Sequence, residues 1–287
     1  MSRCASPNRS GRASAGRRRG RQPPKLTSVV LVLVTGGTGA VGREVVKGLR
    51  AAGHQARVLS RKPGESEDWV QGDIATGAGL ELAVKDADAI VHAASDATHP
   101  RRYQATDVLG TRRLLAMARE AGVRHVVYVS IVGIEDVGYP YYKGKIAAEA
   151  VMRENLVPWS ILRATQFHTL MEIFLDYMSK LPWLATVPFA WQFQPVDPTE
   201  VAARLVQVVT AEPVGMLPNF GGPEVRDLKS LATSWLRIRN PDKRLVNLPL
   251  PFAFSRQFAA GRLLCPENRD GTITFEQYLA RRYPATT

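Results

Sequence analysis

The chain has 287 residues, of which 45% are hydrophobic, so it can bury the core of one large domain or of one domain with a smaller lobe. Its formal net charge is +12, but residues 1–25 hold eight basic side chains and no acid, so the rest of the chain is nearly balanced. No apolar run approaches the roughly 20 residues that a membrane span needs. Two cysteines exclude a disulfide framework, and five scattered histidines disfavour a metal site, so we expect a cytoplasmic protein without membrane or metal.

Residues 1–26 are rich in Ser, Gly, Pro and Arg, and we expect a disordered tail because such a composition cannot bury enough apolar area to fold. A solvated tail or a misplaced start codon is favoured over a nucleic-acid-binding arm. The Arg-rich stretch followed by "LTSVVLVLV" also resembles a secretion signal. That alternative is disfavoured because "TGGTGAVG" is a poor cleavage site and cleavage would remove the first strand.

The segment "VVLVLVTGGTGAVGREVV", residues 29–46, predicts a nucleotide-binding turn. Residues 29–34 read as a buried parallel strand, and a helix follows that ends at Gly53. Between them, Gly36, Gly39 and Gly42 permit a tight turn, close approach of a pyrophosphate and close helix–strand packing. The anion would then lie at a helix N-terminus, and Thr38 and Val41 belong to the same predicted cofactor site.

The second predicted strand, "QARVLSR", bears on the choice of cofactor. Ser60 lies about 20 residues beyond the glycines, where an NAD enzyme usually places an acid for the ribose 2′-hydroxyl. Ser60, Arg61 and Lys62 offer a hydroxyl and two cations instead, which suits a 2′-phosphate. NADP is therefore favoured over NAD, although both cations could belong to a solvated loop.

Strands and helices continue to alternate, which predicts an α/β fold with a Rossmann-like, doubly wound parallel sheet over residues 27–165. The predicted elements are a strand at 89–95, a helix at 106–122, a strand at 124–130, a helix at 141–155 and a strand at 159–165.

Residues 166–287 are expected to form a smaller substrate lobe woven onto the sheet. Its first predicted helix, 166–184, is apolar almost all round. The next has Asp197 as its cap, Pro198 at its first position and Glu200 completing a capping box. A third helix spans 227–237.

Tyr141 and Lys145 lie four residues apart at the start of a predicted helix, and hence on one face. Tyrosine is a weak acid with an ordinary pKa of about 10. An adjacent ammonium would favour the phenolate and lower that pKa, which makes the tyrosine a usable general acid/base beside a hydride acceptor. Lys145 could also hydrogen-bond the nicotinamide ribose.

With these motifs assembled, the sequence resembles the short-chain dehydrogenases/reductases, in their atypical, NmrA-like NAD(P)-binding branch. The resemblance extends over most of residues 29–280. Its motifs are "TGGTGAVG", "GDI" (72–74), "VHAAS", "TDVLGTRRLL", "VVYVSIVG", Tyr141-x-x-x-Lys145 and "WSILRATQFH". It implies that Asp73, with Ile74, meets the adenine, that Ala93, Ala94 and Ser95 flank the ribose, and that Tyr141 and Lys145, with Ser130, are catalytic.

The chain departs from that family at two positions. Asp107 stands where many active relatives carry Asn, which changes the charge of any proton relay there, and Gly144 replaces the usual small polar residue before the lysine. The branch includes both reductases and non-catalytic cofactor sensors, so these departures bear on activity rather than on cofactor binding.

The leading hypothesis is an NADP-dependent oxidoreductase that reduces a small carbonyl or quinone-like substrate. Five residues are expected to form the apolar wall of the pocket: Met171, Phe174, Trp183, Phe189 and Trp191. The alternative is a non-catalytic NAD(P)-responsive binding protein, and a nucleotide-sugar epimerase is disfavoured by the altered positions. His168 is favoured as structural, and the oligomeric state stays open.

Overall fold

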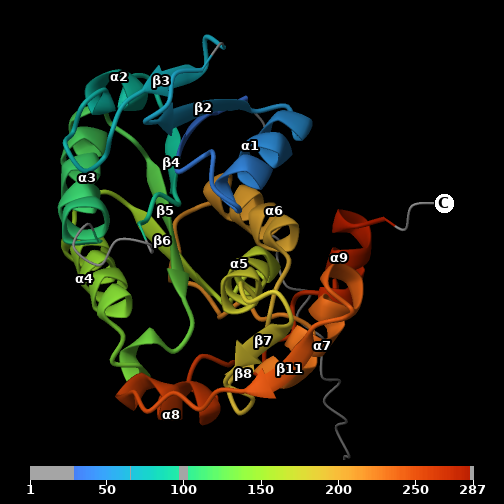
Figure 1. Ribbon diagram of the computed structural model, residues 1–287. Coiled ribbons are helices and arrows are strands. Elements are labelled where there is room, and N and C mark those ends of the chain that lie inside the picture. The colour runs from blue at the N-terminus through green and yellow to red at the C-terminus, as the bar shows by residue number, and fades with distance from the viewer. Residues whose placement is uncertain (1–28, 65, 97–102, 285–287) are drawn as a thin grey trace, which may run out of the picture.

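The computed structural model describes residues 29–64, 66–96 and 103–284, so the predicted tail lies outside the described residues. Its centre is a seven-stranded parallel sheet in the order β3-β2-β1-β4-β5-β6-β9 (Figure 1). The strands are β1 (Leu31–Thr35), β2 (Gln55–Ser60), β3 (Trp69–Gln71), β4 (Ala89–His92), β5 (His125–Ile131), β6 (Trp159–Ala164) and β9 (Gly215–Met216). From β1, strands β2 and β3 are added on one side, and β4, β5 and β6 are then added on the other. This change of side between β1 and β4 confirms the predicted doubly wound Rossmann-like fold.

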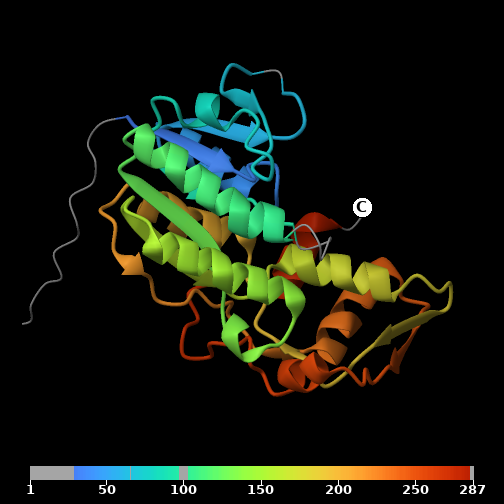
Figure 2. The same ribbon diagram turned by 90° about the vertical axis from the view of Figure 1, so that its left-hand side faces the viewer.

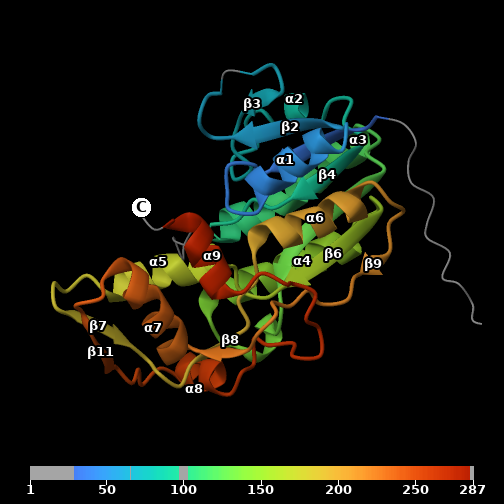
Figure 3. The same cartoon turned by 90° about the vertical axis from the view of Figure 1, so that its right-hand side faces the viewer.

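Helices cover both faces of this sheet, which explains why its central strands β1 and β4 are mostly apolar. Helices α1 (Gly42–Ala51) and α6 (Pro198–Val209) close one face, in front in Figure 3. Helices α2 (Leu80–Val84), α3 (Gly110–Glu120) and α4 (Pro140–Glu154) close the other, where α3 and α4 are prominent in Figure 2. Strand β5 serves both layers: Val127 and Val129 point to the first, and Val126 and Tyr128 to the second.

The chain beyond residue 165 contributes both to the nucleotide-binding core and to a separate lobe. Helix α6 packs on α1 and strand β9 extends the large sheet from β6, so both belong to the nucleotide-binding core. The other elements enclose a third hydrophobic cluster below the sheet in Figure 3. They are α5 (His168–Met178), β7 (Leu184–Val187), β8 (Gln192–Phe193), β10 (Arg226–Asp227), α7 (Leu228–Arg239), β11 (Arg244–Asn247), α8 (Ala253–Ala259) and α9 (Phe275–Arg282).

The helix predicted over 166–184 is too long. Helix α5 ends at Met178, and the last residues of that span turn into β7. Pro182 disfavours helical geometry at the residue before it. Strand β7 then pairs in parallel with β11, about 60 residues away in the chain, a partner that local pattern does not reveal.

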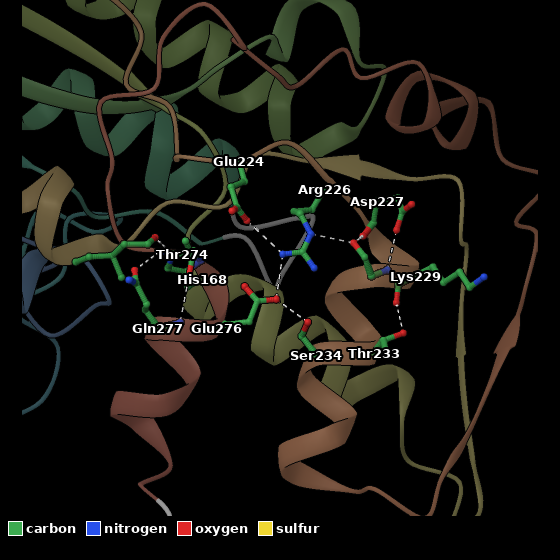
Figure 4. A network of polar contacts seen from close by, with 12 residues as sticks. His168, Glu224, Arg226, Asp227, Lys229, Thr233, Ser234, Thr274, Glu276 and Gln277 are labelled. Carbon is green, nitrogen blue, oxygen red and sulfur yellow. Dashed lines mark hydrogen bonds and ion pairs between the residues drawn. The ribbon is translucent and has the colours of Figure 1, made fainter.

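Charged groups tie the helices of the lobe together (Figure 4). The Arg226 guanidinium lies between Glu224 at 3.2 Å and Glu276 at 3.0 Å, and Glu276 also accepts a hydrogen bond from Ser234 at 2.6 Å. This joins the start of α9 to the side of α7. Thr274 and Gln277 form a capping box at the N-terminus of α9.

His168 is structural in this fold. It is 1% exposed, its Nε2 donates to the Ile273 carbonyl at 2.9 Å, and its ring lies against Phe275 and Tyr278. Cys265 is buried in the same lobe, where its backbone N–H donates to the Gln194 side chain at 2.9 Å.

The cap predicted for α6 is correct, but the capping box is not. Asp197 accepts a hydrogen bond from the Thr199 backbone N–H at 2.9 Å. Glu200 instead accepts from the Thr272 backbone N–H and hydroxyl, both at 2.7 Å, and so anchors the segment before α9. Glu200 therefore bonds to a distant loop instead of to the N-terminus of its own helix.

Asp197→Ala is expected to lower the free energy of unfolding by about 1–2 kcal/mol, because the first turn of α6 loses its capping oxygen. Urea denaturation measures this. The matched control is Asp197→Asn, which keeps an acceptor and removes only the charge that faces half-exposed Arg281. If both variants lose equal stability, the ion pair and not the cap is the source.

Candidate active site

The turn after β1 requires glycine at two positions. Gly36 has φ = 70°, and a Cβ there would lie 2.7 Å from the backbone of Ala93 and Ala94 at the end of β4. A Cβ on Gly42, the first residue of α1, would collide with the Gly36 carbonyl oxygen. A Cβ on Gly39 would meet only the Gly36 carbonyl, at 3.1 Å, so its open side faces the cavities that it lines. Gly36 and Gly42 therefore permit the tight turn, and Gly39 leaves space open on its cavity side.

The first cavity, of ≈ 270 Å³, lies at the carboxyl ends of β1, β2 and β4, where the strand order reverses. Its lining includes ten of the residues predicted for cofactor binding, namely Gly36, Thr38, Gly39, Ser60, Arg61, Asp73, Ile74, Ala93, Ala94 and Ser95. Such a crevice is where doubly wound proteins bind nucleotides. Asp73 also holds its own turn, since its carboxylate accepts from the Ala75 N–H at 2.9 Å.

The loop after β2 brings cations to this cavity. Arg61 lines it and is exposed, and Lys62, also exposed, donates its backbone N–H to the Ser60 hydroxyl at 3.2 Å. Trp69 fixes the loop from outside, because its indole N–H donates to the Lys62 carbonyl at 2.8 Å.

The second cavity, of ≈ 390 Å³, adjoins the first and shares Gly36, Gly39, Ala93 and Ser95 with it. Val41, Gly42, Ser130, Tyr141 and Lys145 all line it. Apart from Lys62, all residues predicted for cofactor binding or catalysis therefore line one of two contiguous cavities.

The apolar wall of the second cavity is made by residues other than those expected. Phe167, Leu170 and Ile173 line it, whereas Met171 and Trp191 are buried in the lobe core with Phe174 and Phe189 against them. Trp183 is 69% exposed and outside the cavity. Helix α5 is apolar on several faces, so its periodicity does not indicate which face meets the cavity.

Tyr141 is joined by hydrogen bonds to a buried ion pair. Its hydroxyl lies 2.7 Å from the Ser95 hydroxyl, which donates to Asp107 Oδ1 at 2.5 Å. Asp107 is fully buried, and the same oxygen lies 4.0 Å from Lys145 Nζ. Four groups from three segments thus form one polar chain that begins at the cavity wall.

Lys145 contacts Val129 and Tyr128 in this structure, rather than the Tyr141 hydroxyl that its spacing suggested. The ammonium donates to the Val129 carbonyl at 2.8 Å and lies 4.4 Å from the centre of the Tyr128 ring. Burial lowers the pKa of Lys145, against the opposing attraction of Asp107 and Glu149. Burial and the Asp107 carboxylate raise the pKa of Tyr141, so the phenolate is disfavoured where the sequence predicted that it would be stabilised.

Two local features bring Asp107 to this position. It lies in a π-helical turn, η1 (Gln104–Leu109), immediately before α3, and such turns often occur at functional sites. Gly144 on α4 makes room for the neighbouring Tyr103 ring, since a Cβ there would collide with it. The glycine that replaces the usual small polar residue therefore permits the close approach of this turn to α4.

Two further polar residues border the second cavity. Ser130 is 2% exposed and lies beside Glu149, whose carboxylate is held by Arg153 and Arg163. Gln166, 4% exposed, was missed from the sequence; its Nε2 donates to the Leu263 carbonyl at 3.4 Å, so its oxygen faces away from that carbonyl. The signal that could have indicated it is its place two residues after a buried strand, at the carboxyl edge of the sheet.

The described part of the chain contains no cluster of three or more histidine, cysteine or acidic residues able to hold a metal ion. No helix among residues 29–64, 66–96 and 103–284 is long and apolar enough to span a membrane.

Fold and cavities together define a dinucleotide-binding protein, and comparison with known proteins specifies the class. Residues 36–170 match the family described as NAD(P)H-binding. The chain therefore contains an NAD(P)-binding domain of Rossmann type.

Its relatives include several reductases and dehydrogenases. The (4-alkanoyl-5-oxo-2,5-dihydrofuran-3-yl)methyl phosphate reductase of Streptomyces griseus is 32% identical over 191 residues, which is 63% of either chain. The 3-beta-hydroxysteroid dehydrogenase of Mycolicibacterium neoaurum is 32% identical over 40% of this chain and 37% of its own. The chain thus matches less than two thirds of the length of each.

Among solved structures, an epimerase from Methanothermobacter thermautotrophicus has a TM-score of 0.72 at 18% identity and covers 89% of this chain and 91% of its own. A short-chain dehydrogenase/reductase superfamily protein from Agrobacterium tumefaciens with bound NAD has a TM-score of 0.66 at 20% identity, over 88% and 95% of the two chains. At these identities the likeness shows the shared fold.

Proposed function

We propose that the protein is an NADPH-dependent oxidoreductase, of the NmrA-like branch and cytoplasmic, that interconverts a small carbonyl or quinone-like substrate and its alcohol. The observation that carries this proposal is the Tyr141 hydroxyl, in the wall of an apolar cavity that adjoins the glycine turn. A bound nicotinamide would supply the hydride.

The residues of the chain divide the remaining work. The N-terminus of α1 and the glycine turn would hold the diphosphate, because the unpaired N–H groups there favour an anion. Lys145 would anchor the nicotinamide ribose, and Tyr141 would exchange the proton at the substrate oxygen. Phe167, Leu170 and Ile173 favour an apolar substrate.

The substrate of the Streptomyces griseus relative, by its printed name, is a furanone with an alkanoyl chain and a phosphate. Its carbonyl groups and apolar chain suit the second cavity, whereas Lys145 is the one cation among the described residues that lines it. We therefore favour an uncharged carbonyl substrate for this chain.

Arg61→Ala should weaken NADPH binding by about tenfold or more and leave NADH binding almost unchanged. A charge-assisted hydrogen bond to the 2′-phosphate contributes roughly 1.5–3 kcal/mol, and about 1.4 kcal/mol is tenfold in affinity. Calorimetry with both cofactors measures the difference. Arg43→Ala, an exposed cation on α1 outside both cavity linings, is the matched control. Equal losses of affinity for NADPH and NADH would show that Arg61 does not determine the preference between them.

The second candidate is a binding protein that responds to NAD(P) without turnover. The raised pKa of Tyr141 and the absence of a Lys145 contact to it within the described residues favour this candidate. The two candidates separate on a substrate screen: tight NADPH binding without NADPH oxidation across carbonyls and quinones would support the binding protein.

A further inference from the structure

The hydrogen bonds around Ser95 have a fixed direction. Asp107 Oδ1 accepts from Ser95, and Oδ2 lies 3.4 Å from the Asp96 backbone N–H, so both oxygens face donors as in a carboxylate. The ammonium of Lys145 on the same side supports the ionised form. Serine has one hydroxyl proton, and it goes to Asp107. Tyr141 must therefore donate to Ser95, which leaves a Tyr141 lone pair for the cavity.

This direction makes Tyr141 an acceptor toward a ligand in the resting protein. An alcohol could donate a hydrogen bond from its hydroxyl to the Tyr141 oxygen. A carbonyl oxygen could not accept a hydrogen bond from Tyr141, because the Tyr141 proton is already donated to Ser95. Phenolate formation does not provide another route, because burial and Asp107 oppose it. The proton therefore has to continue along the chain.

We propose, on the basis of the oxidoreductase function above, that Asp107 receives the substrate proton at the far end of a relay through Tyr141 and Ser95. In alcohol oxidation the substrate would lose a hydride from its C–H bond, for which a bound oxidised nicotinamide would be the acceptor, and its O–H bond would break. That proton joins the Tyr141 oxygen while Tyr141 passes its own to Ser95 and Ser95 passes its own to Asp107. The ketone, the reduced cofactor and a neutral Asp107 carboxyl result, and Tyr141 and Ser95 end as they began.

Carbonyl reduction uses the relay in reverse. Asp107 in its acid form donates to Ser95, Ser95 to Tyr141, and Tyr141 to the oxygen that receives the proton. Reduction therefore needs protonated Asp107 and oxidation needs its carboxylate, so the two directions depend oppositely on pH.

Asp107 has several titratable or charged neighbours in the described chain. The titratable or charged groups around it in the described chain are Lys145, Tyr141 and Glu149 on α4, Tyr128 on β5, and His92 and Asp96 at the end of β4. Burial and Lys145 lower the pKa of His92 to about 3, so it is neutral, and Tyr128 is held protonated by burial.

The decisive experiment compares pH profiles of wild type and Asp107→Asn in both directions. In the wild type, kcat/KM for carbonyl reduction should fall and kcat/KM for alcohol oxidation should rise through one shared ionisation. Asp107→Asn should lose about 10²-fold in both rates and lose that ionisation from both profiles. Ser95→Ala should remove the same ionisation from both pH profiles while it keeps the Asp107–Lys145 pair. This variant keeps the test decisive if Asp107→Asn folds poorly.

A second measurement does not depend on turnover. Infrared difference spectra on acidification should show the C=O band of one carboxylic acid that is absent in Asp107→Asn and shifted in Ser95→Ala. A band unchanged by both variants overturns the relay. So does Tyr141-dependent turnover that keeps its full rate and pH profile in Asp107→Asn, an outcome that leaves the oxidoreductase function intact.

Discussion

Tyr141→Phe is expected to slow turnover by about 10²–10⁴-fold, the range that a positioned proton donor contributes. The ring stays and its packing against Tyr142 is kept, but the hydroxyl that reaches Ser95 is lost. NADPH affinity should change little, because the tyrosine hydroxyl lies outside the lining of the first cavity. NADPH oxidation across a carbonyl and quinone panel, together with calorimetry, measures both effects.

Tyr177→Phe is the matched control, since that tyrosine lies on α5, is 65% exposed and lines neither cavity. It should keep the wild-type rate. Full turnover in Tyr141→Phe would rule out Tyr141 as the proton donor, and with it the relay.

Gly39→Val should reduce the affinity for both dinucleotides by about 100-fold or more. Among the described residues, a Cβ on Gly39 would meet only the Gly36 carbonyl, at 3.1 Å, so a branched side chain would project into the space where the two cavities meet. Methyl groups inserted into a filled site typically cost about 1–3 kcal/mol, and loss of the diphosphate contacts at α1 adds to that.

Gly138→Val is the control, because a Cβ on Gly138 would meet nothing within 4 Å. Thermal melts of both variants separate loss of binding from loss of folding. A folded Gly39→Val protein with undiminished affinity would overturn the assignment of residues 35–42 as the diphosphate site.

The nucleotide-binding half was predictable because its signals are local. An apolar run, three spaced glycines and a helix ended by a glycine of positive φ at Gly53 lie within 25 consecutive residues. Tyr141 and Lys145 share a helix face for a similar reason, since four residues make about one turn. What each of them contacts was not predictable. Ser95, Asp107 and Tyr141 come from three segments, and only the assembled sheet and helices bring them together.

The lobe was less predictable because long-range partners decide its details. Glu200 accepts a hydrogen bond from Thr272 instead of completing a capping box on its own helix, and β7 forms by pairing with β11. The cavity face of α5 follows from how that helix lies between the lobe core and the sheet. Leu170 and Ile173 therefore line the cavity, and Met171 does not.

The buried thiol of Cys265 provides a chemical measure of how often the lobe opens. It is 1% exposed, and burial with nearby Glu267 and Asp270 raises its pKa to about 12, so the reactive thiolate is scarce at neutral pH. Alkylation must then wait until the segment around Gln194 and Asn268 opens. In a protein whose Cys4 is replaced, the alkylation rate of Cys265 reports how often this part of the lobe separates from its packing.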